Sequence, residues 1–308
     1  MPDAPDRSAV AVGPEGMPDW VAAAVVAGGG RVVDVGEADA LVWAHPRRPD
    51  ELRAVLDAHP HLRWVQLPFA GIESHVPLLG PERAWTSGKG VYSAPVAEMA
   101  LALLLAGLRN LGPYARAGGW SGPVGRNLEG ARVVLLGAGG ITGELLRLLG
   151  PFSVDATVVR RDPRPVAGAS NVVATNRLDE VLGGADAVVL ALALTDETRG
   201  IIGRDQLDRI ADHGCLVNVA RGGHVVTDDL IAAFAADAIG SAGLDVTDPE
   251  PLPDDHPLWA EPRCIVTPHV GNTPEMAVPL LSARITDNVR RWVAGEPLVG
   301  VVDVVHGY

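Results

Sequence analysis

The sequence has almost no lysine. Lys89 is its one lysine, so all the other residues in the Lys and Arg total are arginines. Lys89 stands in SGKGV and not in GxxxxGK[ST], which excludes a P-loop. Any Schiff-base chemistry would depend on this residue alone, and we expect it to lie in a loop.

Cysteine is scarce as well. Cys215 and Cys264 each begin a short apolar segment, and no cysteine spacing is typical of a zinc site. Buried free thiols behave as small apolar side chains. We therefore expect two reduced thiols in the core, and no metal.

Positive charge and membrane-length segments are also missing. The formal net charge of −13 disfavours nucleic acids and anionic membranes as partners, because both attract basic proteins. The best apolar candidate, 99–105, is far shorter than the roughly 18 residues of a membrane span. The N-terminal MPDAPDRSAV lacks the apolar core of a signal peptide, so we expect a cytoplasmic protein.

The 308 residues suffice for one large domain or two of ordinary size. Short β-branched runs alternate with helical patterns, which is typical of parallel α/β sheets. We expect a small first sheet and a doubly wound second one. The expected strands are 8–12, 31–35, 40–43 and 62–67 in the first sheet, and 132–136, 156–160, 187–192, 216–220, 241–246 and 264–267 in the second.

Two long helices and an irregular segment complete the pattern. Residues 96–111 predict a helix that is apolar on all sides and therefore buried, in part against a second subunit. The Gly/Pro-rich segment 112–125 is expected to wrap over the surface or a partner. Residues 279–294 predict a last helix that returns to the first lobe.

The stretch RVVLLGAGGITGELL contains an imperfect dinucleotide fingerprint. Gly137 and Gly139 hold its first two positions, which allow a tight turn and bring pyrophosphate close to a helix that begins near Gly140. Thr142 occupies the third position, which normally holds glycine, so we expect less close helix packing there. The flanking strand and helix favour dinucleotide binding.

The end of the next strand bears on the choice of cofactor. An NAD-binding fold usually places an acidic residue here to bind the ribose hydroxyls. This sequence has Arg160 and Arg161, which can pair with a 2′-phosphate. We therefore expect NADP(H); the alternative is a solvated basic turn in which Asp162 takes the acidic role and NAD(H) is used.

A further strand end carries an arginine that packing does not require. In LVNVARGGHV, an apolar run with Asn218 as its one polar residue ends at Arg221, before two glycines. Ligands bind at the carboxyl ends of strands in open α/β sheets, and a guanidinium suits a carboxylate or phosphate. The alternative is a helix-capping or surface arginine.

Four motifs resemble, in their order, those of the D-isomer-specific 2-hydroxyacid dehydrogenases: VYSAPVAEMALALL, VNVARGG, GLDVTDPEPLP and CIVTPHVGNT. The resemblance extends from about Leu62 to the final helix. It implies an α/β fold of two Rossmann-like lobes with doubly wound parallel sheets, and a homodimer. A dinucleotide-binding lobe of residues 97–280 would be inserted in a discontinuous substrate lobe of residues 1–96 and 281–308.

The resemblance also implies a catalytic set of Arg221, Glu250 and His269. Arg221 would hold the substrate carboxylate and polarise the keto group, and His269, paired with Glu250, would give a proton to the carbonyl oxygen. Hydride transfer leaves negative charge on that oxygen, so a fixed cation and a proton source suit the reaction. The other histidines lack a partner motif and are not expected to be catalytic: His45, His59, His61, His75, His213, His224, His256 and His306.

The remaining roles likewise follow from the resemblance. Backbone N–H groups of Phe69, Ala70 and Gly71 would bind the substrate carboxylate, and Asp245 would contact the nicotinamide carboxamide. Glu98 would be structural, and Thr142 and Ala193 depart from the family pattern. Further cofactor contacts would come from Gly140, Ile141, Thr195 and Ala220, and a side-chain pocket from Trp43, Phe69, Tyr92 and Trp259.

The implied activity is the interconversion of a small 2-keto acid and a D-2-hydroxy acid by an NAD(P)-dependent oxidoreductase, in the reductive direction. Glyoxylate and hydroxypyruvate are the expected substrates. A phosphite-type dehydrogenase retains the same three residues and is one alternative, whereas formate-type relatives carry glutamine in place of Glu250. A dinucleotide-sensing scaffold or corepressor is the other alternative, and the intact catalytic set argues against it.

Overall fold

The computed structural model describes residues 7–305, which form two compact units. Unit 1 comprises residues up to Tyr92 and from Pro274, and unit 2 comprises Ser93–Thr273. The expected boundaries, at 96/97 and 280/281, lie a few residues later than these, because each boundary coincides with the first residue of a long helix. Residues 1–6, part of the stretch judged to lack a signal peptide, and His306 lie outside the described residues.

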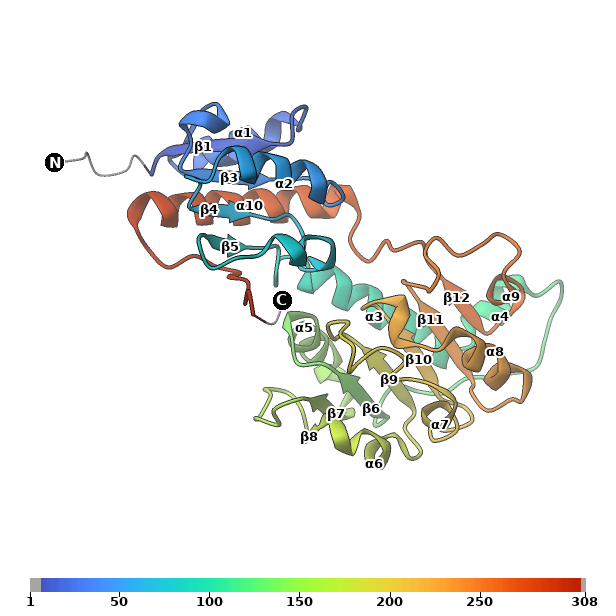
Figure 1. Ribbon diagram of the computed structural model, residues 1–308. Helices are drawn as coiled ribbons and strands as arrows, with labels where there is room; N and C mark the ends of the chain where they lie inside the picture. The colour runs from blue at the N-terminus through green and yellow to red at the C-terminus, as the bar shows by residue number, and fades with distance from the viewer. Residues whose placement is uncertain (1–6, 306–308) are drawn as a thin grey trace. The chain divides into compact units, whose positions relative to one another are not determined.

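Unit 1 is built on a five-stranded parallel sheet in the order β2-β1-β3-β4-β5 (Figure 1). Its apolar residues alternate between two buried faces. Leu41 and Trp43 pack with Leu52 on one face, whereas Trp64 on the other lies 5.5 Å from Trp292 between ring centroids. The strands are β1 (Ala9–Gly13), β2 (Arg31–Val32), β3 (Ala40–Trp43), β4 (Trp64–Gln66) and β5 (Ala84–Thr86), and the helices are α1 (Asp19–Ala27), α2 (Pro49–Ala58) and α10 (Pro274–Ala294).

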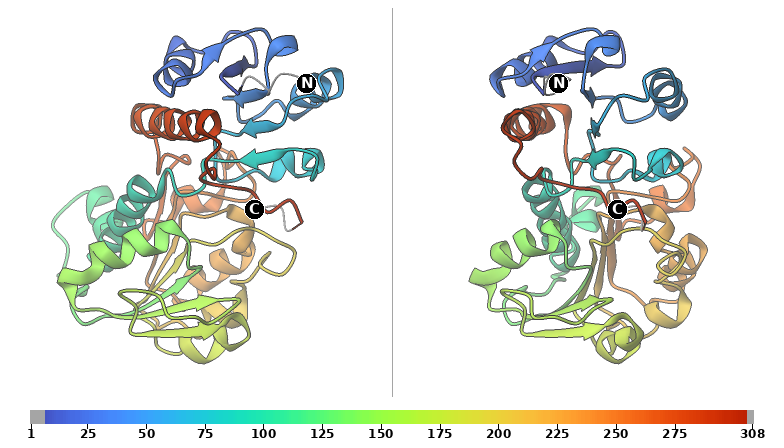
Figure 2. Two further views of the ribbon diagram at one scale, coloured as in Figure 1. Left: turned by 90° about the vertical axis from the view of Figure 1, so that its left-hand side faces the viewer. Right: turned by 60° about the vertical axis from the view of Figure 1, so that its left-hand side comes forward.

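Unit 2 contains a seven-stranded parallel sheet in the order β12-β11-β10-β9-β6-β7-β8. Val133 and Leu135 pack with residues of α3 and α5, and Val134 and Leu136 pack with residues of α6, α7 and α8. Helices cover both faces of this sheet (Figure 2). The strand order reverses at β6, and in a doubly wound sheet the crevice at the carboxyl ends beside such a point binds ligands.

The elements of unit 2 agree with the sequence pattern in their order. The strands are β6 (Arg132–Leu136), β7 (Asp155–Arg160), β8 (Asn171–Ala174), β9 (Ala187–Leu190), β10 (Cys215–Asn218), β11 (Ser241–Leu244) and β12 (Cys264–Val266). The helices are α3 (Ser93–Leu108), α4 (Leu111–Arg116), α5 (Gly140–Leu149), α6 (Leu178–Leu182), α7 (Arg204–Leu207), α8 (Thr227–Ala235) and α9 (Pro257–Ala260).

Four local expectations were wrong. β5 and β8 were missed because three or four residues are too short to display a period. α10 begins at Pro274 and contains Pro279, since a proline near the start of a helix removes few of its hydrogen bonds. The segment 112–125 is not irregular throughout, because α4 occupies its beginning and the Tyr114 hydroxyl hydrogen-bonds to Gly122 and Val124.

Cys215 and Cys264 are both free and buried, as expected. Burial raises the pKa of Cys215 to about 11 and that of Cys264 to about 12, so both thiols stay protonated near neutral pH. Within residues 7–305, no helix is both long enough and apolar enough to cross a membrane.

Candidate active site

The glycine turn between β6 and α5 forms an open cradle of backbone. Gly137 has φ +103°, and a Cβ atom there would collide with the carbonyl of Ala191 after β9, so only glycine fits. Gly139 precedes the first turn of α5, and a Cβ atom there would find no neighbour within 4 Å. The exposed N-terminus of a ten-residue helix therefore offers room and N–H groups to a pyrophosphate.

Thr142, at the third fingerprint position, does not disturb the packing of α5. Its side chain is fully buried, and its hydroxyl donates a hydrogen bond of 3.0 Å to the carbonyl oxygen of Gly137. The threonine therefore fills the space between helix and sheet and also fixes the turn. The looser contact that we expected from the missing glycine is wrong.

The basic turn after β7 holds three arginines and one carboxylate. Arg160 is half-buried at the end of the strand, and Arg161 is exposed. The carboxylate of Asp162 accepts from Nε of Arg164 at 2.8 Å. Asp162, the acidic residue that could bind the ribose hydroxyls of NAD(H), is therefore paired with Arg164.

Arg221, Glu250 and His269 follow the carboxyl ends of three adjacent strands. Arg221 comes three residues after β10, Glu250 six residues after β11, and His269 three residues after β12. Parallel strands end at the same edge of a sheet, so this topology brings the three loops together.

The imidazole of His269 pairs with Glu250. Its Nδ1 atom lies 2.8 Å from Oε1 of Glu250, and both side chains remain partly exposed, at 49% and 37%. The carboxylate accepts from Nδ1 and orients the ring, which leaves Nε2 as the nitrogen that can exchange a proton with a substrate. This is the arrangement of a general acid held by a carboxylate.

Asp245 holds the backbone beneath His269. It is nearly buried, and its Oδ1 atom accepts from the Thr267 hydroxyl at 2.6 Å and from N–H of Val270 at 2.9 Å. Its Oδ2 atom accepts from N–H of Gly271 at 2.8 Å. His269 has φ +54°, a costly conformation for a non-glycine residue that these bonds stabilise.

Asn218 fixes the backbone around Arg221. This fully buried amide accepts from N–H of Ala220 at 3.0 Å and donates to the carbonyl of Arg221 at 2.8 Å. The guanidinium of Arg221 donates from Nη1 to the carbonyl of Ala220 at 2.7 Å. Asn218 was noted in the sequence only as a polar interruption of a strand, and that interruption was the signal for this role.

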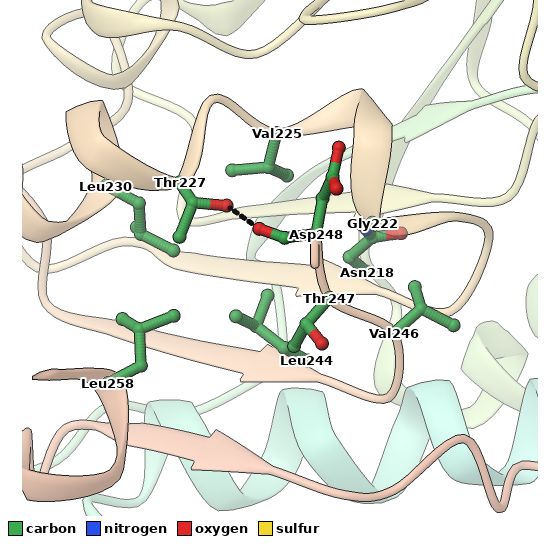
Figure 3. A pocket seen from close by; sticks show the side chains of 10 residues that line it. All are labelled: Asn218, Gly222, Val225, Thr227, Leu230, Leu244, Val246, Thr247, Asp248 and Leu258. Atoms are coloured by element: carbon green, nitrogen blue, oxygen red, sulfur yellow. Dashed lines mark hydrogen bonds between the residues drawn. The ribbon is translucent and has the colours of Figure 1, made fainter. Parts of the chain in front are cut away.

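Gly222 brings the Arg221 loop against the loop that leads to Glu250. A Cβ atom on Gly222 would overlap the carbonyl of Thr247 and crowd the N–H of Asp248. Figure 3 shows the small hollow behind this contact, where the Thr227 hydroxyl donates to the Asp248 carbonyl at 2.9 Å. The first of the two glycines after Arg221 therefore allows the two loops to approach closely.

The backbone N–H groups expected to bind the substrate carboxylate, those of Phe69, Ala70 and Gly71, belong to unit 1. The carbonyl of Pro68 accepts from the Tyr92 hydroxyl at 2.9 Å, and that of Phe69 accepts from N–H of Gly88 at 3.2 Å. The rings of Phe69 and Tyr92 lie 5.6 Å apart. These contacts hold the loop that continues into Ala70 and Gly71.

Of the four residues expected to form a side-chain pocket, Trp43 and Tyr92 are buried, and Trp43 does not fit that expectation. Trp43 is 1% exposed and belongs to the core of unit 1, because its place on a central strand turns it inward. Phe69 and Trp259 are partly exposed, and Trp259 donates to the carbonyl of Pro253 at 2.9 Å. Glu98 is exposed on α3.

These features define an α/β dinucleotide-binding protein that presents an arginine and a histidine–glutamate pair at one sheet edge. Residues 99–271 match the family model for the NAD-binding domain of D-isomer-specific 2-hydroxyacid dehydrogenases. An uncharacterized protein of Corynebacterium melassecola is 37% identical over 299 residues, which cover 92% of this chain and 95% of that protein. Glyoxylate/hydroxypyruvate reductase A of Photorhabdus laumondii is 30% identical over 87% of each chain.

A solved structure is similar over nearly the whole length. The D-isomer-specific 2-hydroxyacid dehydrogenase of Xanthobacter autotrophicus Py2, in complex with NADPH and MES, is 28% identical with a TM-score of 0.83. The match covers 97% of this chain and 99% of that one. The chain belongs to the D-isomer-specific 2-hydroxyacid dehydrogenase family, and it is a nicotinamide-dependent oxidoreductase of small 2-keto and 2-hydroxy acids.

Proposed function

We propose that the protein reduces glyoxylate, hydroxypyruvate or a similarly small 2-keto acid with NADPH. The observation that carries this proposal is the His269–Glu250 pair at the edge of the sheet where Arg221 also lies. A fixed cation and an oriented proton donor are what carbonyl reduction requires. The similarity to a glyoxylate/hydroxypyruvate reductase supports the substrate class.

In this mechanism the protein binds the substrate carboxylate, polarises the keto group and protonates the keto oxygen. The Arg221 guanidinium holds the carboxylate and draws charge toward the keto oxygen, with N–H groups of Phe69, Ala70 and Gly71 as further donors. When bound, the reduced nicotinamide supplies the hydride. His269 gives its Nε2 proton to the oxygen as negative charge develops there, and Glu250 stabilises the imidazolium beforehand.

The cofactor side is assigned to the backbone cradle and the turn after β7. Gly137, Gly139, Gly140 and Ile141 would hold the pyrophosphate at the N-terminus of α5. The further proposed contacts are Thr195, Ala220 and Asp245, and Asp245 would meet the carboxamide while it holds the His269 loop. Arg160 and Arg161 would pair with the 2′-phosphate, and the Asp162–Arg164 ion pair supports NADP(H) over NAD(H).

We also propose a homodimer in the cytoplasm. The dimer is supported by one segment of unit 2, which exposes three large apolar side chains: Leu111, Trp120 and Val124. Such side chains gather where a second copy packs. Light scattering of the purified protein tests the dimer, and Trp120→Ser should shift the mass toward a monomer.

The activity is tested by the loss of NADPH and NADH absorbance over a panel of 2-keto acids that includes glyoxylate and hydroxypyruvate. We expect turnover with NADPH well above that with NADH, and a fall of at least about a hundredfold in kcat/KM for Arg221→Ala. Normal turnover by that variant would contradict the mechanism. Reduction of NADP by phosphite without 2-keto acid activity would favour the phosphite-type alternative, and cofactor binding without any turnover would favour a sensing scaffold.

A further inference from the structure

A buried histidine ends the loop that begins with Arg221. The loop passes through a 3₁₀ turn, η5 (Gly222–His224), and His224 is 0% exposed. Nδ1 of its ring lies 2.9 Å from the carbonyl oxygen of Arg221, and Nε2 lies 3.3 Å from that of Ala193. The His224 ring therefore connects the loop that begins with Arg221 to the loop after β9. The latter loop packs through Ala191 against the glycine turn at Gly137.

The carbonyl of Arg221 is the point where several donors converge. It accepts from Nδ2 of Asn218 at 2.8 Å and from the backbone N–H of His224 at 3.2 Å, in addition to the imidazole. These bonds fix the peptide plane after Arg221. The direction of the Cα–Cβ bond follows from that plane, and so does the direction in which the guanidinium leaves the backbone.

Near neutral pH the imidazole ring of His224 is neutral and can donate one hydrogen bond. Burial lowers the pKa of His224, and the nearby charges of Arg221 and Arg199 lower it further, against the two carbonyls that raise it. A neutral imidazole has a single N–H. The Nδ1 contact is the shorter one, at 2.9 Å against 3.3 Å for Nε2, so we assign the proton to Nδ1.

We propose that His224 is a positioning residue for Arg221, which it holds through a hydrogen bond from Nδ1 to the arginine's carbonyl. The proposal rests on the proposed role of Arg221 as the group that binds the substrate carboxylate. Loss of the bond lets the Arg221 peptide rotate, so the guanidinium meets the carboxylate less often in the productive orientation. A small misplacement of this kind costs rate because electrostatic catalysis depends on fixed geometry.

The test compares three substitutions that separate the two ring nitrogens. Asparagine places its Nδ2 near Nδ1 of the histidine, glutamine places its Nε2 near Nε2, and alanine provides no donor. We expect His224→Ala to lose about 10- to 100-fold in kcat/KM for the 2-keto acid, with a raised KM. His224→Asn should recover to within about threefold of the native enzyme, and His224→Gln should not.

A matched histidine elsewhere provides the control. His213 has its Nε2 atom 2.7 Å from Oδ1 of Asp186, just before β9 and therefore at the opposite edge of the sheet. His213→Asn should lower the melting temperature without changing KM for the 2-keto acid. That result separates a general loss of stability from a loss of positioning.

The proposal is overturned if His224→Ala has native kinetic constants, or if the asparagine and glutamine variants fold equally well and are equally impaired. Arg221→Ala is measured beside them. If that variant keeps full turnover, the proposed function of the site fails; if it is inactive while the His224 variants are native-like, only the positioning role fails.

Discussion

Gly222 and Thr247 touch backbone to backbone, so closely that a Cβ atom on the glycine would overlap the threonine's carbonyl. Gly222 follows Arg221, and Thr247 precedes Glu250 by three residues. The contact therefore sets the spacing between the loops that carry two members of the catalytic set.

Gly222→Ala tests this spacing. The added methyl group must push the two loops apart, and we expect kcat/KM to fall by about tenfold or more with a lower melting temperature. The matched control is Gly223→Ala, whose Cβ atom would meet only the ends of the Arg199 and Leu194 side chains, which can move aside. Native activity in Gly222→Ala, or an equal loss in both variants, would contradict the assignment.

Glu250→Gln tests the charge of the His269 partner. The amide oxygen can still accept from Nδ1, but it no longer stabilises the imidazolium, so kcat should fall by about 10- to 100-fold with little change in KM. A solvent isotope effect on kcat should grow as proton transfer becomes limiting. Asp254→Asn removes an exposed carboxylate four residues further along the chain and should leave the kinetics unchanged. A similar loss in that variant would point to net charge as the cause.

The cofactor preference of arginine variants tests whether the turn after β7 binds the 2′-phosphate. Arg160→Ala combined with Arg161→Ala should raise KM for NADPH by at least about tenfold and leave KM for NADH nearly unchanged, because each arginine can form charge-assisted bonds to a 2′-phosphate. Arg164→Ala should produce a smaller shift of the same sign, about two- to fivefold, since it frees the Asp162 carboxylate and that pair is exposed. Arg147→Ala, which breaks an exposed ion pair on α5, is the control. Equal losses with both cofactors would contradict a specific contact to the 2′-phosphate, and native constants with both would favour the solvated basic turn of the NAD(H) alternative.

Acid stability tests the Glu261–Arg263 pair beside β12. Hydrogen bonds from Arg263 lower the pKa of Glu261 below its usual value of 4.5, against partial burial, which raises it. A lowered carboxyl pKa stabilises the fold above the unfolded-state pKa, and the contribution disappears as pH falls through the folded-state pKa. Glu261→Gln should therefore cost about 1 kcal/mol at pH 7, and the difference from the native protein should vanish well below pH 4.5.

Urea unfolding at several pH values measures this difference. Glu180→Gln, on a fully exposed pair with Arg177, is the control and should change the free energy of unfolding little at any pH. A difference for Glu261→Gln that persists unchanged at pH 3 would show that lost packing, and not lost charge, destabilises the variant.

The sequence by itself determined the order of the elements, apart from the short strands β5 and β8, and the identity of the chemical groups. Gly137 and Arg221 could be singled out because each stands at or soon after the end of an apolar run, where a parallel sheet exposes its ligands. Local patterns are enough for such positions, since strand ends follow from the period and length of the runs. Glu250 and His269 were assigned through the resemblance of their motifs to those of the family.

Only the tertiary structure decided how these groups are held. Asn218, His224 and Asp245 bond to loops whose conformation no local pattern records, and Thr142 compensates for a missing glycine through a hydroxyl that finds its acceptor only after folding. Trp43 and Phe69 are both large aromatic residues, and the sequence does not distinguish them. In the folded protein Trp43 is buried in the core, whereas Phe69 remains partly exposed. Burial and bonds such as that of Asp245 with Gly271 depend on neighbours that are distant in the chain, and those neighbours are fixed when the strands pair. The bonds of Asn218, His224 and Thr142 span few residues, but they form only in loop and turn conformations that the packing of the sheet imposes.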